Sequence, residues 1–262
     1  MMIEAEQTFV TTMGKAELDR VTLRGYDLCS ELVGRLTFGQ MAYLMLTGQM
    51  PTPEQGRMVD SLLVILVEHG MTSSAIAARL TYSTAPEALQ GAVAAAILGA
   101  GSVHLGSATD CARMLTEALS GQPDDADLDS IAESVVDRYM AERRILPGLG
   151  HRTHSGGDPR ADRLFEIAAE TGVAGRHCAL LRLIAEKATA RRGRLLPINV
   201  TGAMGAISCD LGLPWQVAKG FAIVGRALGA VAHLADEVRE PMGKRMSDLI
   251  NAHVVYQDPP RR

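Results

Sequence analysis

The sequence has few aromatic residues, since phenylalanine, tyrosine and tryptophan make up only 4% of its 262 residues. Runs of alternating β-branched residues are also missing, whereas alanine, leucine, methionine and glycine are abundant. Because strands favour aromatic and β-branched residues and helices favour unbranched ones, this composition predicts an all-α fold. A hydrophobic content of 47% is enough for a substantial core in one large or two modest domains.

The chain also lacks any sustained run of basic residues. Its formal net charge is -4 and its pI is near 6.0, which gives no electrostatic footprint for nucleic acid or an anionic membrane. The longest apolar stretch, residues 91–101, is well short of a membrane span, and residues 1–6 lack the basic and apolar regions of a signal peptide. We therefore expect a cytoplasmic protein with neither nucleic-acid nor membrane partners.

The cysteines give no metal or redox signature. They lie far apart, without a CxxC pair, at Cys29, Cys111, Cys178 and Cys209. This spacing favours buried thiols. His151 and His154 form an HxxH pair, but no carboxylate or cysteine lies at a supporting spacing on a recognisable helix. We predict neither a metal site nor a tightly bound cofactor.

Helical periodicity recurs along most of the chain. Thr52 before Pro53, and Asp158 before Pro159, are typical of helix starts with proline in the first turn, and an Asp158 cap would fix the direction of Arg160. Residues 7–23 could form a short β-hairpin. The predicted helices cover residues 38–47, 55–68, 86–98, 110–119, 128–143, 159–171, 175–191 and 215–238.

The glycine-rich loop at residues 146–160, LPGLGHRTHSGGDPR, is the most informative segment. It brings His151 and Arg160 together on a backbone that can approach a ligand closely, because glycine has no side chain. A planar guanidinium suits a carboxylate, and an imidazole can move a proton near neutral pH. The loop indicates a site for a carboxylated substrate, although a helix-to-helix turn with a solvated arginine has the same features.

Two other histidines lie at breaks between helices. His69 precedes a helix start rich in threonine and serine, where backbone N–H groups and hydroxyls can bind an anion. His104 lies in the segment GAGSVHLGSA, which follows an alanine-rich helix. Each of them, taken singly, is more often a structural or solvent-facing histidine than a catalytic one.

The order of these motifs resembles the citrate synthase superfamily over nearly the whole chain. Their joint spacing is far more specific than any single motif. The matching segments are residues 23–27 (the family's RGYD), 69–79 (HExNASTxxAR), 101–108 (GPLHGGAN), 150–160 (GHR…DPR) and 226–229 (RALG). The resemblance implies a citrate synthase-like fold in which residues 1–109 and 200–262 form a large helical domain and residues 110–199 a smaller inserted helical domain.

The resemblance also implies which residues bind the substrate. His69, Arg160 and Arg226, together with His151, would bind an oxaloacetate-like portion, and Arg239 would reach the site of a neighbouring subunit. Several arginines suit a di- or tricarboxylate, because charge-assisted pairs are among the stronger polar contacts. Coenzyme A would be bound by Leu146, Gly148, Gly150, Arg191 and Arg194.

The catalytic residues implied by the resemblance are His104, His151 and Thr201. His104 would stabilise a thioester enolate, and His151 would exchange a proton with the hydroxyl or carbonyl oxygen of the partner. The carboxylate of the family's proline-asparagine-valine-aspartate motif is replaced by Thr201. Because a neutral hydroxyl is a poor base near pH 7, ordinary condensation should be weak, and Thr201 would instead return the final proton through water.

The short chain and Thr201 favour the citryl-CoA lyase-like members of the superfamily. The predicted reaction cleaves a 3-hydroxy-3-carboxyacyl-CoA into an acyl-CoA and a 2-oxoacid such as oxaloacetate, with coenzyme A as part of substrate and product. Two alternatives remain open: a citrate synthase-like condensing enzyme with an altered substrate, and a non-catalytic acyl-CoA-binding homologue. The resemblance further implies a homodimer or a higher oligomer built from it.

Overall fold

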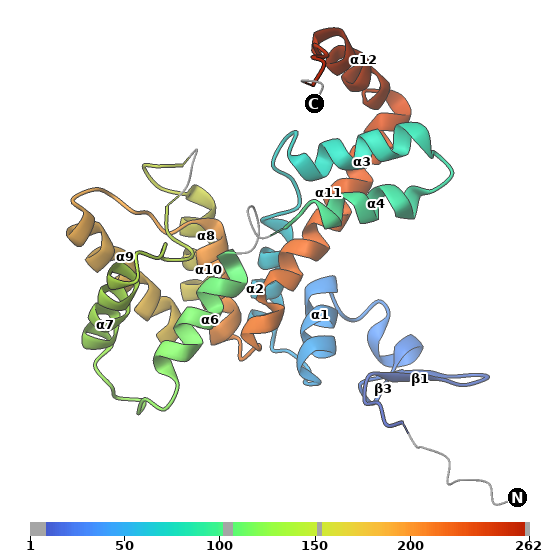
Figure 1. Ribbon diagram of the computed structural model, residues 1–262. Helices are drawn as coiled ribbons and strands as arrows, with labels where there is room; N and C mark the ends of the chain where they lie inside the picture. Colours follow the sequence, from blue (N-terminus) through green and yellow to red (C-terminus); the bar gives the residue numbers. More distant parts are fainter. Residues whose placement is uncertain (1–8, 102–106, 151–153, 260–262) are drawn as a thin grey trace, which may run out of the picture.

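The structure is a computed structural model that describes residues 9–101, 107–150 and 154–259. Helices make up most of it, which confirms the all-α prediction (Figure 1). In chain order the elements are β1 (Gly14–Ala16), β2 (Val21–Leu23), β3 (Tyr26–Asp27), the π-helical turn η1 (Leu28–Leu32), α1 (Phe38–Thr47), α2 (Pro53–Val64), α3 (Ser73–Thr84), α4 (Leu89–Leu98), α6 (Ser107–Leu119), α7 (Leu128–Ala141), α8 (Pro159–Glu170), α9 (Arg176–Arg192), α10 (Val200–Asp210), the 3-10 turn η2 (Trp215–Val217), α11 (Ala218–Arg239) and α12 (Gly243–His253).

The helices form two groups joined by α2 and α11. On one side α10 packs against α6, α8 and α9, and α7 packs against α9; on the other, α3 and α4 pack on α11, and α12 on α3 (Figure 1). The main core draws on α2, α6 to α10 and the start of α11, and a smaller core lies between α3, α4 and α11. The domain boundaries at residues 110 and 199 stay a prediction.

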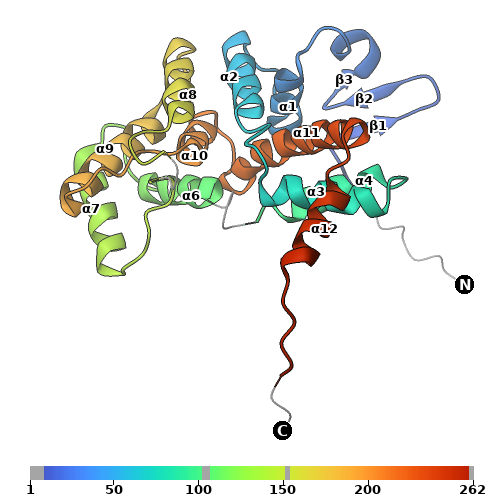
Figure 2. The same cartoon turned by 90° about the horizontal axis from the view of Figure 1, so that it is seen from above.

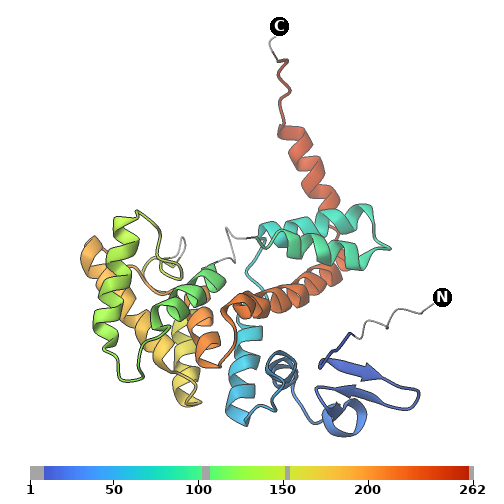
Figure 3. The same ribbon diagram turned by 60° about the horizontal axis from the view of Figure 1, so that its bottom comes forward.

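A three-stranded antiparallel sheet, in the order β1-β2-β3, precedes the helices. Its β1–β2 pair is a hairpin within the residues where the sequence suggests one. The RGYD element links this sheet to α1, because Nε and Nη2 of Arg24 donate to the carbonyl of Met45 at 3.1 and 2.6 Å. Asp27 caps η1. Figures 2 and 3 both show the sheet on the side of the molecule opposite to α7 and α9.

The two helix starts predicted from proline are confirmed. Thr52 caps α2 in a capping box with Gln55, and Asp158 caps α8 by accepting from the backbone N–H of Arg160. The helices predicted from the sequence include neither α10 nor α12, and of α3 only the helix start after His69 is predicted. Ten consecutive residues of α10, from its start at Val200, are buried, so this helix shows no polar face and no amphipathic period from which to predict it.

One helical stretch among the described residues, Trp215–Arg239, is long and apolar enough to cross a membrane by length and composition alone. The core helix of a soluble protein passes the same test, so a single such helix is weak evidence. This stretch contributes to both cores, because its Phe221 is buried in the main core and its Leu234 in the smaller one. The predicted absence of a membrane partner stays a prediction.

Candidate functional site

Two of the predicted catalytic residues, His104 and His151, lie outside the residues that the structure describes. Their roles therefore stay predictions. The third, Thr201, lies in the first turn of α10 and is 6% exposed. The geometry of the site is accordingly built from the residues around these positions.

Three of the predicted substrate-binding residues come together although they are far apart in sequence. His69 follows α2, Arg160 lies in the first turn of α8, and Arg226 lies in α11. Partial burial and the positive charges of Arg160 and Arg226 lower the pKa of the His69 imidazole, which favours its neutral form. Two guanidinium groups beside a neutral imidazole suit an anion with more than one carboxylate.

His154 belongs to the same group of side chains. Its ring centroid lies 6.3 Å from that of His69, and its charge also acts to lower the pKa of His69. The sequence suggests for His154 only a role as a metal ligand, in the HxxH pair with His151, and not this position beside His69. The available signal was its position in the same glycine-rich loop as His151 and Arg160. Within the described ranges, no group of three or more histidine, cysteine, aspartate or glutamate side chains could hold a metal ion.

Asp158 fixes the direction of Arg160. Asp158 is only 1% exposed. Its carboxylate accepts from Nε and Nη2 of Arg160 at 2.9 and 3.0 Å, and from the backbone N–H of Val200 at 2.9 Å. Burial alone would raise the pKa of this carboxyl, but the hydrogen bonds from Arg160 and Val200 hold it below its usual value. The ionised carboxylate therefore ties the start of α8 to the start of α10 and orients the guanidinium, as predicted.

The predicted coenzyme A loop is fixed to the segment that precedes α10. The backbone N–H of Gly150 donates to the carbonyl of Pro197 at 2.7 Å, and that of Asn199 donates to the carbonyl of Gly148 at 2.9 Å. These bonds resemble a short antiparallel pairing of two extended segments. Both are backbone–backbone bonds, so they hold the loop beside Thr201 and leave the side chains of the loop out of this attachment.

A close approach of two glycines completes this attachment. Gly148 has a φ of +83°, and a Cβ there would lie 2.7 Å from the Cα of Gly202 in α10. A Cβ on Gly202 would in turn lie 2.4 Å from the carbonyl oxygen of Gly148. Because no side chain fits at either position, the loop backbone lies directly on the first turn of α10.

The hydroxyl of Thr201 belongs to a hydrogen-bond network in which the donor and the acceptor of each bond can be assigned. The side chain of Asn199 donates from Nδ2 to the carbonyl of Gly150 at 2.8 Å, and its Oδ1 accepts from the backbone N–H of Gly202 at 3.0 Å. The hydroxyl of Thr201 must then donate to Oδ1 of Asn199, at 2.7 Å. Its oxygen accepts from the hydroxyl of Ser107, the first residue of α6. Asn199, to which the sequence analysis gives no role, is the centre of this network.

The remaining predicted arginines lie away from this group. Arg191 forms ion pairs with Glu133 and Asp137 of α7. Arg194 is exposed beyond the end of α9, and Arg239 is exposed at the end of α11. For Arg191 to contact a phosphate of coenzyme A, it would have to exchange its carboxylate partners for that phosphate.

A cavity of about 740 Å³ lies between α8, α9 and residues 195–198. Asp158 and Pro197 line its wall, but its described lining contains none of His69, Arg160 and Arg226. Its lining includes Arg182 but also three carboxylates, from Asp162, Glu166 and Glu186, which would repel an anionic substrate. We therefore assign the candidate site to the converging His69, Arg160 and Arg226 rather than to this cavity.

The fold is all-α, and His69, Arg160 and Arg226 converge between its two groups of helices. Residues 51–246 match the family model described as citrate synthase, C-terminal domain. This match covers most of the chain, which therefore belongs to the citrate synthase family.

Solved structures match nearly the whole chain. The citryl-CoA lyase of Hydrogenobacter thermophilus has a TM-score of 0.86 at 35% identity, covering 98% of this chain and 97% of that one. The ATP citrate lyase of Methanothrix soehngenii, in complex with citrate and coenzyme A, has a TM-score of 0.79 at 22% identity, covering 98% and 43%. The second likeness supports the fold alone.

Curated relatives match over a smaller share of their length. The citrate synthase of Deinococcus radiodurans is 29% identical over 167 residues, which cover 64% of this chain and 40% of the relative. The putative citrate synthase 2 of Mycobacterium tuberculosis is 28% identical over 218 residues, covering 80% and 53%. The chain thus spans about half the length of these relatives or less.

Proposed function

We propose that the protein cleaves a 3-hydroxy-3-carboxyacyl-CoA such as citryl-CoA into an acyl-CoA and a 2-oxoacid. The observation that carries this proposal is the likeness to the Hydrogenobacter thermophilus citryl-CoA lyase, which extends over nearly the full length of both chains. The curated citrate synthases are matched over about half their length at most. The replacement of the family's carboxylate by Thr201 favours the same reading.

The substrate carboxylates would bind where His69, Arg160 and Arg226 converge. Asp158 already orients Arg160, so less freedom is lost when the ligand binds. The coenzyme A portion would lie along the backbone of Leu146, Gly148 and Gly150. The close packing of Gly148 on Gly202, the neighbour of Thr201 in α10, supports this position. Arg191 and Arg194 would approach its phosphates.

In the proposed reaction, His151 takes the proton of the tertiary hydroxyl, and that oxygen becomes the ketone of the 2-oxoacid. The carbon–carbon bond breaks, and its electron pair passes to the acyl portion as a thioester enolate that His104 stabilises. A proton added to the α-carbon completes the acyl-CoA. The roles of the two histidines come from the family resemblance.

Thr201, acting through water, would return this last proton. Its own proton is directed to Asn199 and its oxygen accepts from Ser107, so delivery requires protons to exchange along this hydroxyl chain. Protonating an enolate demands less of the donor than deprotonating a thioester demands of a base. The same transition state is crossed in both directions, so the equilibrium between the reactants sets the direction of net reaction.

A condensing enzyme with an altered substrate is the second candidate, and it is favoured by curated relatives that are citrate synthases. A third candidate, a non-catalytic acyl-CoA-binding homologue, is favoured by the neutral side chain of Thr201. Loss of turnover in both His104→Ala and His151→Ala would exclude the third.

The deciding experiment incubates the purified protein with citryl-CoA and with branched or longer 3-hydroxy-3-carboxyacyl-CoAs, and follows the thioesters by mass spectrometry. We expect release of an acyl-CoA and a 2-oxoacid by the wild type and not by His151→Ala. Thioesters that stay intact with every substrate would contradict the lyase and favour the condensing or binding alternatives.

We also propose that the protein acts as a homodimer. One face of α11 exposes apolar side chains at spacings of four, three and seven residues, namely Val224, Leu228, Val231 and Val238. Such a stripe on one helix face is typical of a surface that packs against another chain. The exposed Arg239 at the end of α11 would then be available to a neighbouring subunit.

A further inference from the structure

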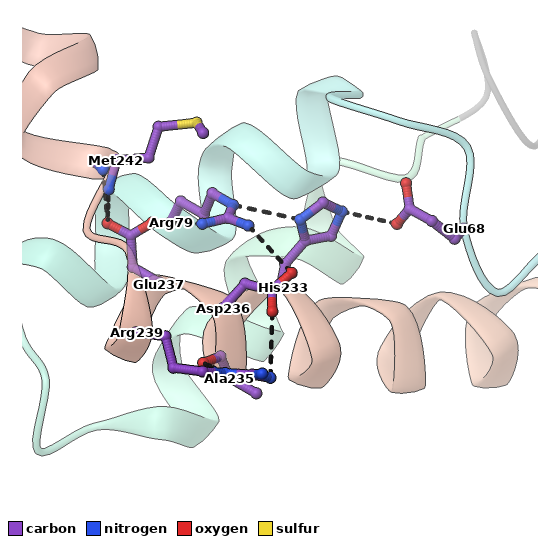
Figure 4. Close-up of polar contacts among 9 residues, drawn as sticks. Glu68, Arg79, His233, Ala235, Asp236, Glu237, Arg239 and Met242 are labelled. Atoms are coloured by element: carbon purple, nitrogen blue, oxygen red, sulfur yellow. Dashed lines mark hydrogen bonds and ion pairs between the residues drawn. The ribbon is translucent and has the colours of Figure 1, made fainter.

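An almost fully buried ion pair joins α3 to α11. Arg79 is 5% and Glu237 3% exposed, and Nη1 of Arg79 donates to Oε2 of Glu237 at 2.6 Å. The other oxygen of Glu237 accepts from the backbone N–H groups of Met242 and Gly243, where α12 begins. Because both charges are paired and hydrogen-bonded, this pair is a rigid point at the junction of three helices (Figure 4).

His233 connects this pair to the candidate site. Its Nδ1 lies 3.3 Å from Nε of Arg79, and its Nε2 lies 2.7 Å from Oε2 of Glu68 (Figure 4). Because a guanidinium N–H can only donate, Nδ1 must accept, and the proton of the ring must be on Nε2. Arg79 thus sets the tautomer of His233, and His233 donates to Glu68.

Glu68 extends the contact to the substrate-binding residues. Its Oε1 accepts from the backbone N–H of His69 at 2.8 Å. Glu68, His233 and Arg226 also line one recess of about 10 Å³, which has room for no more than a single water molecule. One carboxylate therefore holds His69 and faces Arg226.

The hydrogen bond from His233 restrains a carboxylate, that of Glu68, which is otherwise exposed to solvent. Its side chain is 47% exposed, whereas that of His233 is 14% and that of Arg79 is 6% exposed. An exposed carboxylate samples several rotamers, and each one that breaks the bond to His69 loosens the segment before α3. A fixed donor removes that freedom before any ligand binds.

We propose that His233 is a positioning residue, which anchors Glu68 to the buried Arg79 so that His69 and Arg226 are held ready for the carboxylates of the substrate. The identity of the ligand rests on the proposed function, but the effect of His233 on His69 does not. His233 itself contacts no part of the substrate.

The experiment compares His233→Leu with His233→Gln in the full-length chain. Leucine removes both contacts, whereas the amide of glutamine keeps one acceptor for Arg79 and one donor for Glu68. The first measurement is hydrogen exchange at the His69 amide in the ligand-free protein. The second is the Kd for oxaloacetate by calorimetry, and the third is thermal unfolding.

In His233→Leu we expect faster exchange at the His69 amide and a Kd raised on the order of 10- to 100-fold, the usual effect of removing a group that orients a binding residue. His233→Gln should restore most of both. The matched control is His177→Leu, because His177 also contacts a carboxylate: its Nδ1 lies 2.8 Å from Oδ1 of Asp210. His177 lies at the start of α9, away from the candidate site. It should change neither His69 exchange nor the Kd.

Unchanged exchange at His69 in His233→Leu, whether or not the protein is less stable, would overturn the proposal, since Glu68 would then hold His69 without help. Equal losses in His233→Leu and His233→Gln would also contradict it. If the wild type fails to bind oxaloacetate, the proposed ligand is wrong, and the exchange at His69 still decides whether His233 positions it.

Discussion

The carboxylate of Asp158 binds the guanidinium of Arg160 at two points, with the aspartate side chain completely buried and the arginine side chain 18% exposed. The pair lies at the start of α8, and the aspartate also accepts from the backbone N–H of Val200, the first residue of α10. The candidate substrate-binding residue Arg160 is thus oriented by the same carboxylate that joins two helices, so we expect stability and binding to be coupled at this position.

Replacing Asp158 by asparagine should separate these contributions. Asparagine keeps an acceptor for the backbone but removes the charge that balances Arg160, so we expect a loss of about 3 kcal/mol in the free energy of unfolding. Chemical denaturation measures this, and calorimetry with oxaloacetate should show weaker binding. An unfolding free energy equal to that of the wild type would show that the ion pair contributes nothing net.

The pH dependence of this contribution has a definite sign. Because the pKa of Asp158 is lower in the folded state than its usual value, the folded protein gains stability wherever the carboxyl is ionised. That gain is present above about pH 4, the unfolded value, and is lost as the pH falls through the lower folded value. The difference in unfolding free energy between the wild type and Asp158→Asn should therefore be smallest at acid pH, where Asp158 is protonated.

The position of Thr201 offers a test of the missing base. In Thr201→Asp the new carboxylate could accept a proton from the thioester α-carbon, so we expect exchange of the acetyl-CoA α-hydrogens in D₂O to rise on the order of 100-fold or more, the usual contribution of a general base. Mass spectrometry follows the deuterium. Thr201→Asn is the control, since it has the same shape without a base, and equal exchange in the two variants would contradict the prediction.

Gly148 and Gly150 form a matched pair for testing how the coenzyme A loop is attached. Both have positive φ, +83° and +76°, so alanine costs about 1 to 2 kcal/mol of backbone strain at each. A Cβ at Gly148 would also meet the backbone of Gly202, whereas a Cβ at Gly150 would have no contact within 4 Å among the residues that the structure describes. We therefore expect Gly148→Ala to be the more destabilising in chemical denaturation, and to weaken coenzyme A binding more. Equal losses would mean that the loop moves away from α10 at no cost.

The periodic helices and the two proline-marked starts could be predicted because local chemistry decides them. Phe38–Thr47 matches the prediction residue for residue, and Thr52 and Asp158 cap as their side chains suggest. Local chemistry fails at α10, where burial on every side removes the polar face that would mark a helix. It also fails at α12, which begins without a side chain of its N-cap residue, Met242, as a cap. The backbone N–H groups of Met242 and Gly243 donate instead to Glu237, near the end of the preceding helix α11.

The site shows the same division. His69, Arg160 and Arg226 could be selected by motif, but the residues that orient them could not. Asn199 looks like an ordinary helix cap, and His233 looks like a packing residue on a helix face. Their roles depend on partners such as Glu68 and Gly150, which only the folded chain brings near. Motifs therefore select candidate binding residues more readily than they select the residues that orient them.

His69 should report ligand binding through its protonation. Partial burial, Arg160, Arg226 and His154 lower its pKa, whereas Asp158 acts to raise it. A bound dicarboxylate adds negative charge beside these groups, so the pKa of His69 should rise on binding. By linkage, the affinity for oxaloacetate should then increase as the pH falls from 7 through the pKa of the free protein.

Calorimetry across this pH range, with NMR titration of the histidine rings, measures both quantities. His69→Gln cannot take up the proton, so its affinity should lose most of the pH dependence, while Arg160 and Arg226 still attract the ligand. The same pH dependence in His69→Gln would assign the proton to another group, and His154 is then the first to test, because its ring centroid lies 6.3 Å from that of His69. The variant therefore decides whether His69 is the imidazole that responds to the substrate carboxylates.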